Sequence, residues 1–274
     1  MKDDSYSSVH ASLANGGAEV RQLAQHALAV LAADGPGRGD GLGRKLEQLL
    51  EAFLSSDEDK RHDMLMRLRQ DGVPIGDIID HILPAVARIM GERWAADQIS
   101  FAHVTIGTAR LQEAVRVLGW HDKTRQRVAE TAPVILLIIP KPEHHTLGAF
   151  VLADQWRRMG FRVDIAIDQH PRQIADMLRK RRYVMIGITA AGRRTLASAR
   201  ELVDTIRLTA ARATPIFVGG AVLDRDIDVL AITGADHVAR DAGSALRVCG
   251  LVDAGWEAPS LVTNDHAGPR HDRR

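Results

Sequence analysis

The chain has 274 residues, 45% of them hydrophobic, which is enough for about two domains with buried cores. Its 36 Lys and Arg against 35 Asp and Glu leave a formal net charge of +1, so overall charge does not favour nucleic acid or an anionic membrane as a partner. The longest apolar run, Val134–Ile139, is too short to span a membrane, and the first residues lack a secretion signal, which predicts a cytoplasmic protein without membrane contact. A single cysteine, Cys249, excludes an internal disulfide and a Cys-x-x-Cys site, so any metal must be held by histidine or arrive within a prosthetic group.

Residues 1–42 are predicted to form a flexible arm, a short amphipathic helix over residues 18–33 and a glycine-rich linker. Residues 43–120 then have helical spacing of apolar positions throughout. Asp57 is the expected N-cap of the second helix and Ser100 of the fourth, and Pro84 predicts a kink inside the third. Four helices with short connections predict a helical-bundle cap.

From residue 131 to residue 252 the pattern changes to alternating strands and helices, and residues 253–274 read as a loose tail. The expected strands are 134–139, 162–167, 184–188, 216–218 and 237–239. The expected helices are 147–159, 171–180, 194–208, 223–232 and one near Leu246. Five such units predict an α/β domain with a doubly wound, five-stranded parallel sheet of Rossmann-like or flavodoxin-like type. Ligands of such sheets bind at the carboxyl ends of the strands, so the loops after the first, third and fourth strands are candidate sites.

These loops carry a small set of suggestive residues. The first contains Glu143 and His145, the residue types of a metal ligand and of the acceptor that fixes its tautomer. The loop over residues 189–192 and the pair Gly219-Gly220 have few side-chain atoms, so a bulky ligand can approach the backbone there. Each feature also has an ordinary explanation, because histidine is common in surface loops and glycine is common in tight turns. Their coincidence at one edge of one sheet favours a binding site.

These residues resemble the cobalamin-binding domain of methionine synthase and its relatives, whose motifs are Asp-x-His-x-x-Gly, Ser-x-Leu and Gly-Gly. The matching positions here are Glu143, His145 and Gly148, then Thr189 and Ala191, then Gly219 and Gly220. The resemblance implies that His145 is the lower axial ligand of cobalt and that Glu143 is its hydrogen-bond partner. It also implies that Thr189 and the backbone of Gly219 and Gly220 line the slot for the nucleotide tail of the cofactor.

This chain departs from the family pattern at two of these positions. Glu143 is one methylene longer than the family's Asp, and Ala191 is smaller than its Leu. The departures predict a wider slot and a lower affinity for the cofactor.

The helical segment adds a second resemblance. Residues 91–100 are similar to the end of the cap that precedes this domain in corrinoid proteins and cobalamin photoreceptors, where a Trp covers the upper corrin face. Trp94 is the matching residue, with an ordinary core aromatic as the alternative, and Val104 and Thr105 stand where the photoreceptors have a Glu-His pair. Residues 104–112, VTIGTARLQ, are similar to the AerR and PpaA regulators of purple photosynthetic bacteria, and that likeness spans residues 44–250.

Three functions follow from these resemblances. The AerR and PpaA likeness implies a light-responsive antirepressor without catalytic turnover, which holds hydroxocobalamin or adenosylcobalamin and acts on a transcriptional repressor of the CrtJ or PpsR type. No DNA-binding motif is evident in the sequence, which predicts that contact with DNA is indirect or weak. The second function is a corrinoid methyl carrier of a methyltransferase system, which shares the architecture. The third is a haem-binding redox sensor on the same scaffold, because His145 could ligate iron as well as cobalt.

Overall fold

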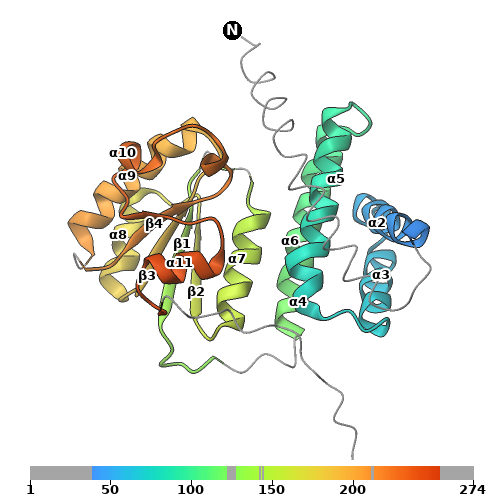
Figure 1. Cartoon of the computed structure of the whole chain (residues 1–274), viewed down its shortest axis with the longest axis horizontal. Helices are drawn as coiled ribbons and strands as arrows, with labels where there is room; N and C mark the ends of the chain where they lie inside the picture. Colours follow the sequence, from blue (N-terminus) through green and yellow to red (C-terminus); the bar gives the residue numbers. More distant parts are fainter. Residues whose placement is uncertain (1–38, 122–127, 142, 144, 211–212, 254–274) are drawn as a thin grey trace, which may run out of the picture.

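The computed structural model describes residues 39–121, 128–141, 143, 145–210 and 213–253, which form a helical cap and an α/β domain (Figure 1). Of the arm, helix and linker predicted for residues 1–42, residues 1–38 lie outside the described residues, as do residues 254–274 of the tail predicted for residues 253–274. Within the described ranges, no helix combines the length and apolar character needed to cross a membrane.

The cap contains the four helical segments that the sequence predicts. They are α2 (Gly39–Leu54), α3 (Glu58–Gln70), a continuous segment made of α4 (Ile75–Asp77), η1 (Ile78–Ile82) and α5 (Leu83–Ala95), and α6 (Phe101–His121). Helix α2 begins inside the expected linker, four residues before the predicted start. Both predicted N-caps are confirmed, since Asp57 accepts the N–H of Lys60 at 3.0 Å and Ser100 Oγ accepts the N–H of His103 at 3.3 Å.

The third cap segment contains a π-turn immediately before Pro84. Proline has no N–H to donate, and its ring collides with the carbonyl group four residues earlier in an α-helix. Here the N–H of Leu83 bonds to the carbonyl of Ile78, five residues back. The disruption expected at Pro84 therefore takes the form of a π-turn, which inserts one residue into a helical turn without ending the helix.

Two residues of segment 104–112 hold the cap together. Gly107 packs against Met90, and a Cβ at position 107 would lie 2.5 Å from the terminal methyl carbon of that side chain. Arg110 donates hydrogen bonds of 2.9 and 3.0 Å to the carbonyls of Phe53 and Leu54 at the end of α2. These carbonyls have no hydrogen-bond donor within their own helix, so Arg110 caps the C-terminal end of α2.

The α/β domain has five parallel strands in the order β2-β1-β3-β4-β5. Its elements are β1 (Val134–Ile139), α7 (Leu147–Arg158), β2 (Arg162–Ile167), α8 (Pro171–Lys180), β3 (Met185–Thr189), α9 (Arg193–Thr209), β4 (Ile216–Gly219), η2 (Ala221–Asp224), α10 (Val229–Thr233), β5 (His237–Val238) and α11 (Ala242–Val248). Helices α8, α9 and α10 cover one face, and α7 and α11 cover the other (Figure 1). The predicted doubly wound sheet is confirmed, and its strand order reverses between β1 and β3, where ligands of such sheets bind.

One expected helix is wrong. Residues 223–232 form two short pieces, the 3-10 turn η2 and the helix α10, separated by extended backbone at Arg225. Asp228 then starts α10 by accepting the N–H of Ala231 at 3.0 Å. The apolar spacing indicated a single helix, but an aspartate that caps from inside the segment breaks it into two.

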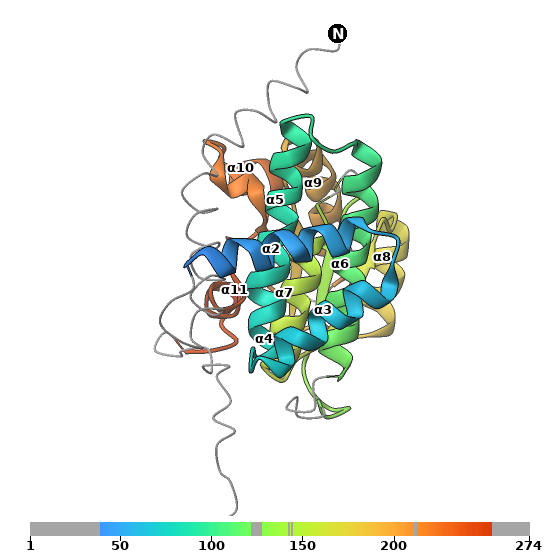
Figure 2. The ribbon, with the colours of Figure 1, turned by 90° about the vertical axis from the view of Figure 1, so that its right-hand side faces the viewer.

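Helix α7 is shared by both domains. Ala149, Ala153 and Trp156 face the sheet, whereas Leu147 and Val151 belong to the buried core of the cap. Figure 2, which looks onto the cap, shows α7 behind α5 and α6. The two domains therefore pack through a continuous apolar contact along this helix.

A buried ion cluster joins the domains at the far end of α7. Arg158 lies 2.5 Å from Asp80 of the π-turn and 2.8 Å from Asp154 of its own helix. Burial lowers the pKa of Arg158, but the two carboxylates more than offset this effect and hold its pKa above the ordinary value. The cluster thus fixes the cap to α7 through charges that are largely removed from water.

Candidate functional site

The loop between β1 and α7 presents an imidazole to solvent and buries a carboxylate behind it. The side chain of His145 is 84% exposed, and that of Glu143 is 2% exposed. Glu143 Oε1 accepts the backbone N–H of His145 at 2.8 Å and lies 3.1 Å from Nδ1 of its ring. When Nδ1 donates to the carboxylate, the neutral ring carries its lone pair on Nε2. This is the arrangement that orients a histidine for binding a metal.

The two groups stabilise each other's charged forms. Burial raises the pKa of Glu143, but hydrogen bonds from the side chain and backbone of His145 outweigh burial and bring its pKa below the ordinary value. The hydrogen bond with Glu143 raises the pKa of His145, while the positive charge of Arg225 opposes that increase. The second carboxylate oxygen, Glu143 Oε2, is also buried, and the backbone N–H of Ala191 contributes to lowering the pKa of this carboxyl group.

The ends of β3 and β4 interlock at the same edge of the sheet. Thr189 is paired with Gly219 in the strand register, and the N–H of Ala190 donates to the carbonyl of Gly219 at 2.8 Å. A Cβ at Gly219 would lie 2.7 Å from the carbonyl oxygen of Ala239, and one at Gly220 would lie 2.6 Å from that of Ala190. The glycine pair is therefore required by the packing of the chain itself, as in the tight-turn explanation given above.

Open space surrounds two other glycines at this edge. Gly148 lies in the first turn of α7 and Gly192 is the N-cap of α9. A Cβ at either position would have no atom within 4 Å. The packing of the chain gives no reason for glycine at position 148, whereas a ligand that approaches the first turn of α7 would give one.

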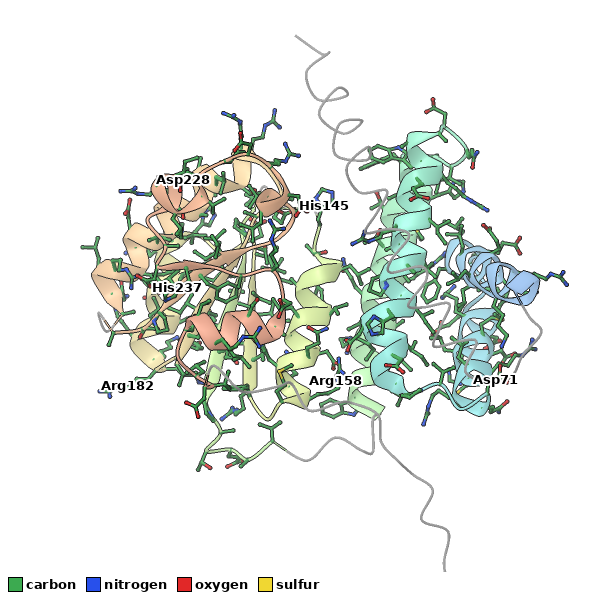
Figure 3. The ribbon with its side chains drawn as sticks, in the orientation of Figure 1. Asp71, His145, Arg158, Arg182, Asp228 and His237 are labelled. Carbon is green, nitrogen blue, oxygen red and sulfur yellow. The ribbon has the colours of Figure 1, made fainter. Side chains whose placement is uncertain are left out.

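Trp94 lies in the cap, near the C-terminal end of α5, and is half-buried. Its ring centroid is 6.1 Å from that of Phe101, whose side chain is 68% exposed. Helices α5 and α6 extend past the first turn of α7, so their connecting turn projects beyond the level of His145 on the cap side of the molecule (Figures 1 and 3). The structure thus brings Glu143 and His145 into direct contact and places Trp94 on a separate element, the C-terminal end of α5.

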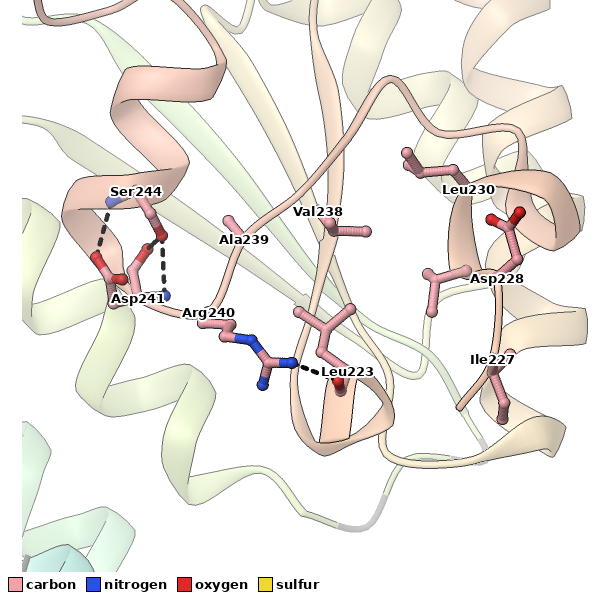
Figure 4. Close-up of a pocket in the computed structure, with 10 residues that line it drawn as sticks. Leu223, Ile227, Asp228, Leu230, Val238, Ala239, Arg240, Asp241 and Ser244 are labelled. Atoms are coloured by element: carbon pink, nitrogen blue, oxygen red, sulfur yellow. Dashed lines mark hydrogen bonds between the residues drawn. The ribbon is translucent and has the colours of Figure 1, made fainter. Parts of the chain in front are cut away.

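A pocket of about 520 Å³ lies elsewhere, beside β5. Its apolar lining comes from Leu223, Ile227, Leu230 and Val238, and its lining includes none of the predicted cofactor residues (Figure 4). Arg240 at its rim donates to the carbonyl of Leu223, as Figure 4 shows. This pocket could not be predicted from the sequence, because its walls come from three short pieces of chain.

No group of three or more His, Cys, Asp or Glu in the described part of the chain is arranged to hold a metal ion. Cys249 is half-buried, and burial raises the pKa of its thiol to about 12, which disfavours the thiolate that binds metals. His145 could therefore supply one ligand to a metal whose other ligands belong to a prosthetic group.

Sequence reasoning missed two residues next to this loop. Arg225 is close enough to His145 to influence its pKa, and Gln112 of α6 donates a hydrogen bond to Thr146 Oγ1. Gln112 was inside segment 104–112 but carried no signal beyond that likeness. Arg225 lies in a loop whose path could not be read from apolar spacing.

Comparisons with known proteins agree with this architecture. Residues 133–249 match the B12 binding domain family, and residues 45–118 match a second B12 binding domain family. An uncharacterized 20.5 kDa protein in the bchF-crtJ intergenic region of Rhodobacter capsulatus is 31% identical over 180 residues, which cover 66% of this chain and 94% of that protein.

More distant similarity extends to corrinoid proteins of Methanosarcina barkeri. Monomethylamine corrinoid protein 1 is 21% identical over 207 residues, which cover 74% of this chain and 94% of that protein. The solved structure of the monomethylamine corrinoid protein from this organism aligns with a TM-score of 0.61 at 16% identity, over 77% of this chain and 99% of the other. At this identity the structural likeness establishes the fold alone.

Proposed function

This chain belongs to the AerR-type family of cobalamin-binding proteins, and on that premise we propose that it is a light-responsive antirepressor with His145 as the lower axial ligand of cobalt. The observation that carries the proposal is an exposed imidazole, oriented through Nδ1 by the buried Glu143, at the point where the strand order reverses. Gly148, in the first turn of the helix that follows His145, is compatible with a large ligand, because a Cβ at this position would meet no atom within 4 Å.

Each predicted residue has a distinct task in this proposal. Glu143 holds the ring of His145 so that Nε2 faces outward, and Gly148 admits the macrocycle to the first turn of α7. Thr189 and the backbone at Gly219 and Gly220 would line the slot for the nucleotide tail, and Trp94 of the cap would contact the macrocycle. When bound, a corrinoid supplies absorption of visible light and an exchangeable upper ligand.

The regulatory role is supported by the relative from the bchF-crtJ intergenic region, which shares 31% identity with this chain. We infer that the output is altered binding to a transcriptional repressor of the CrtJ or PpsR type, through a change in how the cap packs against the ligand loop. The 21% identity with a monomethylamine corrinoid protein favours a second candidate, a methyl carrier in a methyltransferase system.

The His145→Ala variant tests the ligand assignment. We expect the native chain loaded with hydroxocobalamin to have the absorption spectrum of a histidine-ligated corrinoid, and the variant to lose the pigment or to have a water-ligated spectrum. His62→Ala, which removes an exposed imidazole from α3, is the matched control and should match the native spectrum. Retention of an unchanged spectrum by His145→Ala would contradict the assignment, and preferential binding of haem in a parallel loading would favour the haem sensor.

A second experiment separates the regulator from the carrier. We expect the adenosylcobalamin-loaded chain, after illumination, to change the affinity of a CrtJ-type repressor for its operator relative to a dark sample. The measurement is a DNA-binding titration of the repressor with the loaded chain, with the cobalamin-free chain as control. Transfer of the methyl group from the methylcobalamin-loaded chain to a thiol acceptor, with no effect on the repressor in light or darkness, would replace the regulator with the carrier.

A further inference from the structure

We propose that Gln112 is a positioning residue that couples the cap to the lower ligand of the cofactor. Its side-chain amide, on α6, donates a hydrogen bond to the hydroxyl of Thr146, the residue that follows His145. This inference rests on the proposed role of His145 and adds a physical link between that residue and the cap.

The hydroxyl of Thr146 does not cap the helix that it precedes. Thr146 is the N-cap of α7, and a threonine at this position normally accepts a backbone N–H from the first turn of its own helix. Thr146 makes no such side-chain bond, and its oxygen accepts from Gln112 instead. The first turn of α7 is therefore tied to the cap in place of being capped locally.

As a result, the ligand loop is held from both domains. Glu143, in the α/β domain, accepts the backbone N–H of His145 at 2.8 Å, and Gln112, in the cap, holds the next residue along the chain. Side chains of Leu147 and Val151 then pack into the core of the cap. A displacement of α6 would move the backbone at Thr146 and would thereby change the orientation of the neighbouring His145 imidazole.

Helix α6 also carries the residue that packs on Trp94. Phe101, which packs on Trp94, is at its first turn, and Gln112 is about three turns further along, at a distance of roughly 16 Å along the axis. An uninterrupted α-helix is stiff over this length, so its two ends move together. A change at the contact between Trp94 and Phe101 is thereby transmitted through Gln112 to the loop of His145.

The test compares variants that remove the hydrogen bond without changing side-chain volume greatly. Gln112→Leu removes the donor, Thr146→Val removes the acceptor, and Thr146→Ser keeps a hydroxyl. The full chain is loaded with hydroxocobalamin, and the rate at which excess cyanide displaces the lower histidine is followed by absorption. We expect Gln112→Leu and Thr146→Val each to raise this rate about 3- to 10-fold, the change that corresponds to loss of one hydrogen bond. We expect Thr146→Ser to restore the native rate.

A double variant and a control variant show whether the rate depends on this hydrogen bond. The double variant should be no faster than either single variant, because both remove the same interaction. Gln48→Leu, which alters an exposed glutamine of α2, is the matched control and should have the native rate. Native rates in Gln112→Leu and Thr146→Val, whether or not their thermal stability falls, would overturn the coupling. If Gln112→Leu does not fold, the pair Thr146→Val and Thr146→Ser decides in the same way. Failure of His145→Ala to alter the spectrum would instead overturn the proposed function.

Discussion

Arg158→Met is expected to lower the free energy of unfolding by about 3–5 kcal/mol, because it removes the cation from a buried cluster. Asp80 and Asp154 are 10% and 4% exposed, and Arg158 lies 2.5 and 2.8 Å from their oxygens. Without Arg158, the charge of two carboxylates stays buried next to an apolar side chain. Denaturant unfolding of the cobalamin-free chain, followed by circular dichroism, measures the loss.

Two further variants test whether the loss comes from uncompensated buried charge. Arg179→Met removes a cation of the same type from an exposed pair with Asp176 on α8, and its cost should stay below about 1 kcal/mol. Combining Arg158→Met with Asp80→Asn and Asp154→Asn should recover part of the lost stability, since no uncompensated charge remains. A loss below about 1 kcal/mol for Arg158→Met would show that the cluster does not hold the cap to α7.

Gly220→Ala is expected to lower the free energy of unfolding by about 2–6 kcal/mol. The loss has two sources that act together, an unfavourable backbone conformation and a steric collision. Gly220 has φ of 112°, a region that residues with a Cβ rarely adopt. The added carbon would also lie 2.6 Å from the carbonyl oxygen of Ala190, which accepts the N–H of Val222 at 3.1 Å. The ends of β3 and β4 would have to separate, so we expect weaker retention of cobalamin in gel filtration as well as lower stability.

Gly192→Ala is the matched control for this substitution. Gly192 lies at the same edge of the sheet, its backbone is extended with φ of −160°, and an added Cβ meets no atom within 4 Å. We expect its stability to stay within about 0.5 kcal/mol of the native chain. Equal stability of Gly220→Ala and Gly192→Ala would mean that the loop after β4 relaxes freely around a side chain.

Features encoded by neighbouring residues could be predicted from the sequence. Strand β1 is a continuous apolar run because both of its faces are covered, and Asp57 and Ser100 act through amides only three residues away. The contact between Glu143 and His145 has the same origin, since two residues of spacing in a short loop bring the side chains together. The parallel sheet followed from the alternation of strands and helices.

Features that depend on how distant segments pack could not be predicted. Asp80 and Arg158 are 78 positions apart, and Gln112 and Thr146 are 34 apart. Their contacts depend on the angle at which the cap meets α7 and on the π-turn, neither of which has a periodic signature. The break inside residues 223–232 was missed because apolar spacing outweighed the capping signal at Asp228.

The double role of α7 limits how this molecule could have been assembled from parts. A gene fragment that encoded the α/β domain alone would leave Leu147 and Val151 facing water, and one that encoded the cap alone would lack two side chains of its own interior. Neither half is therefore a self-sufficient module for recombination. Any exchange of the cap in evolution or in the laboratory must bring α7, or a surface that complements it, along with the transplanted helices.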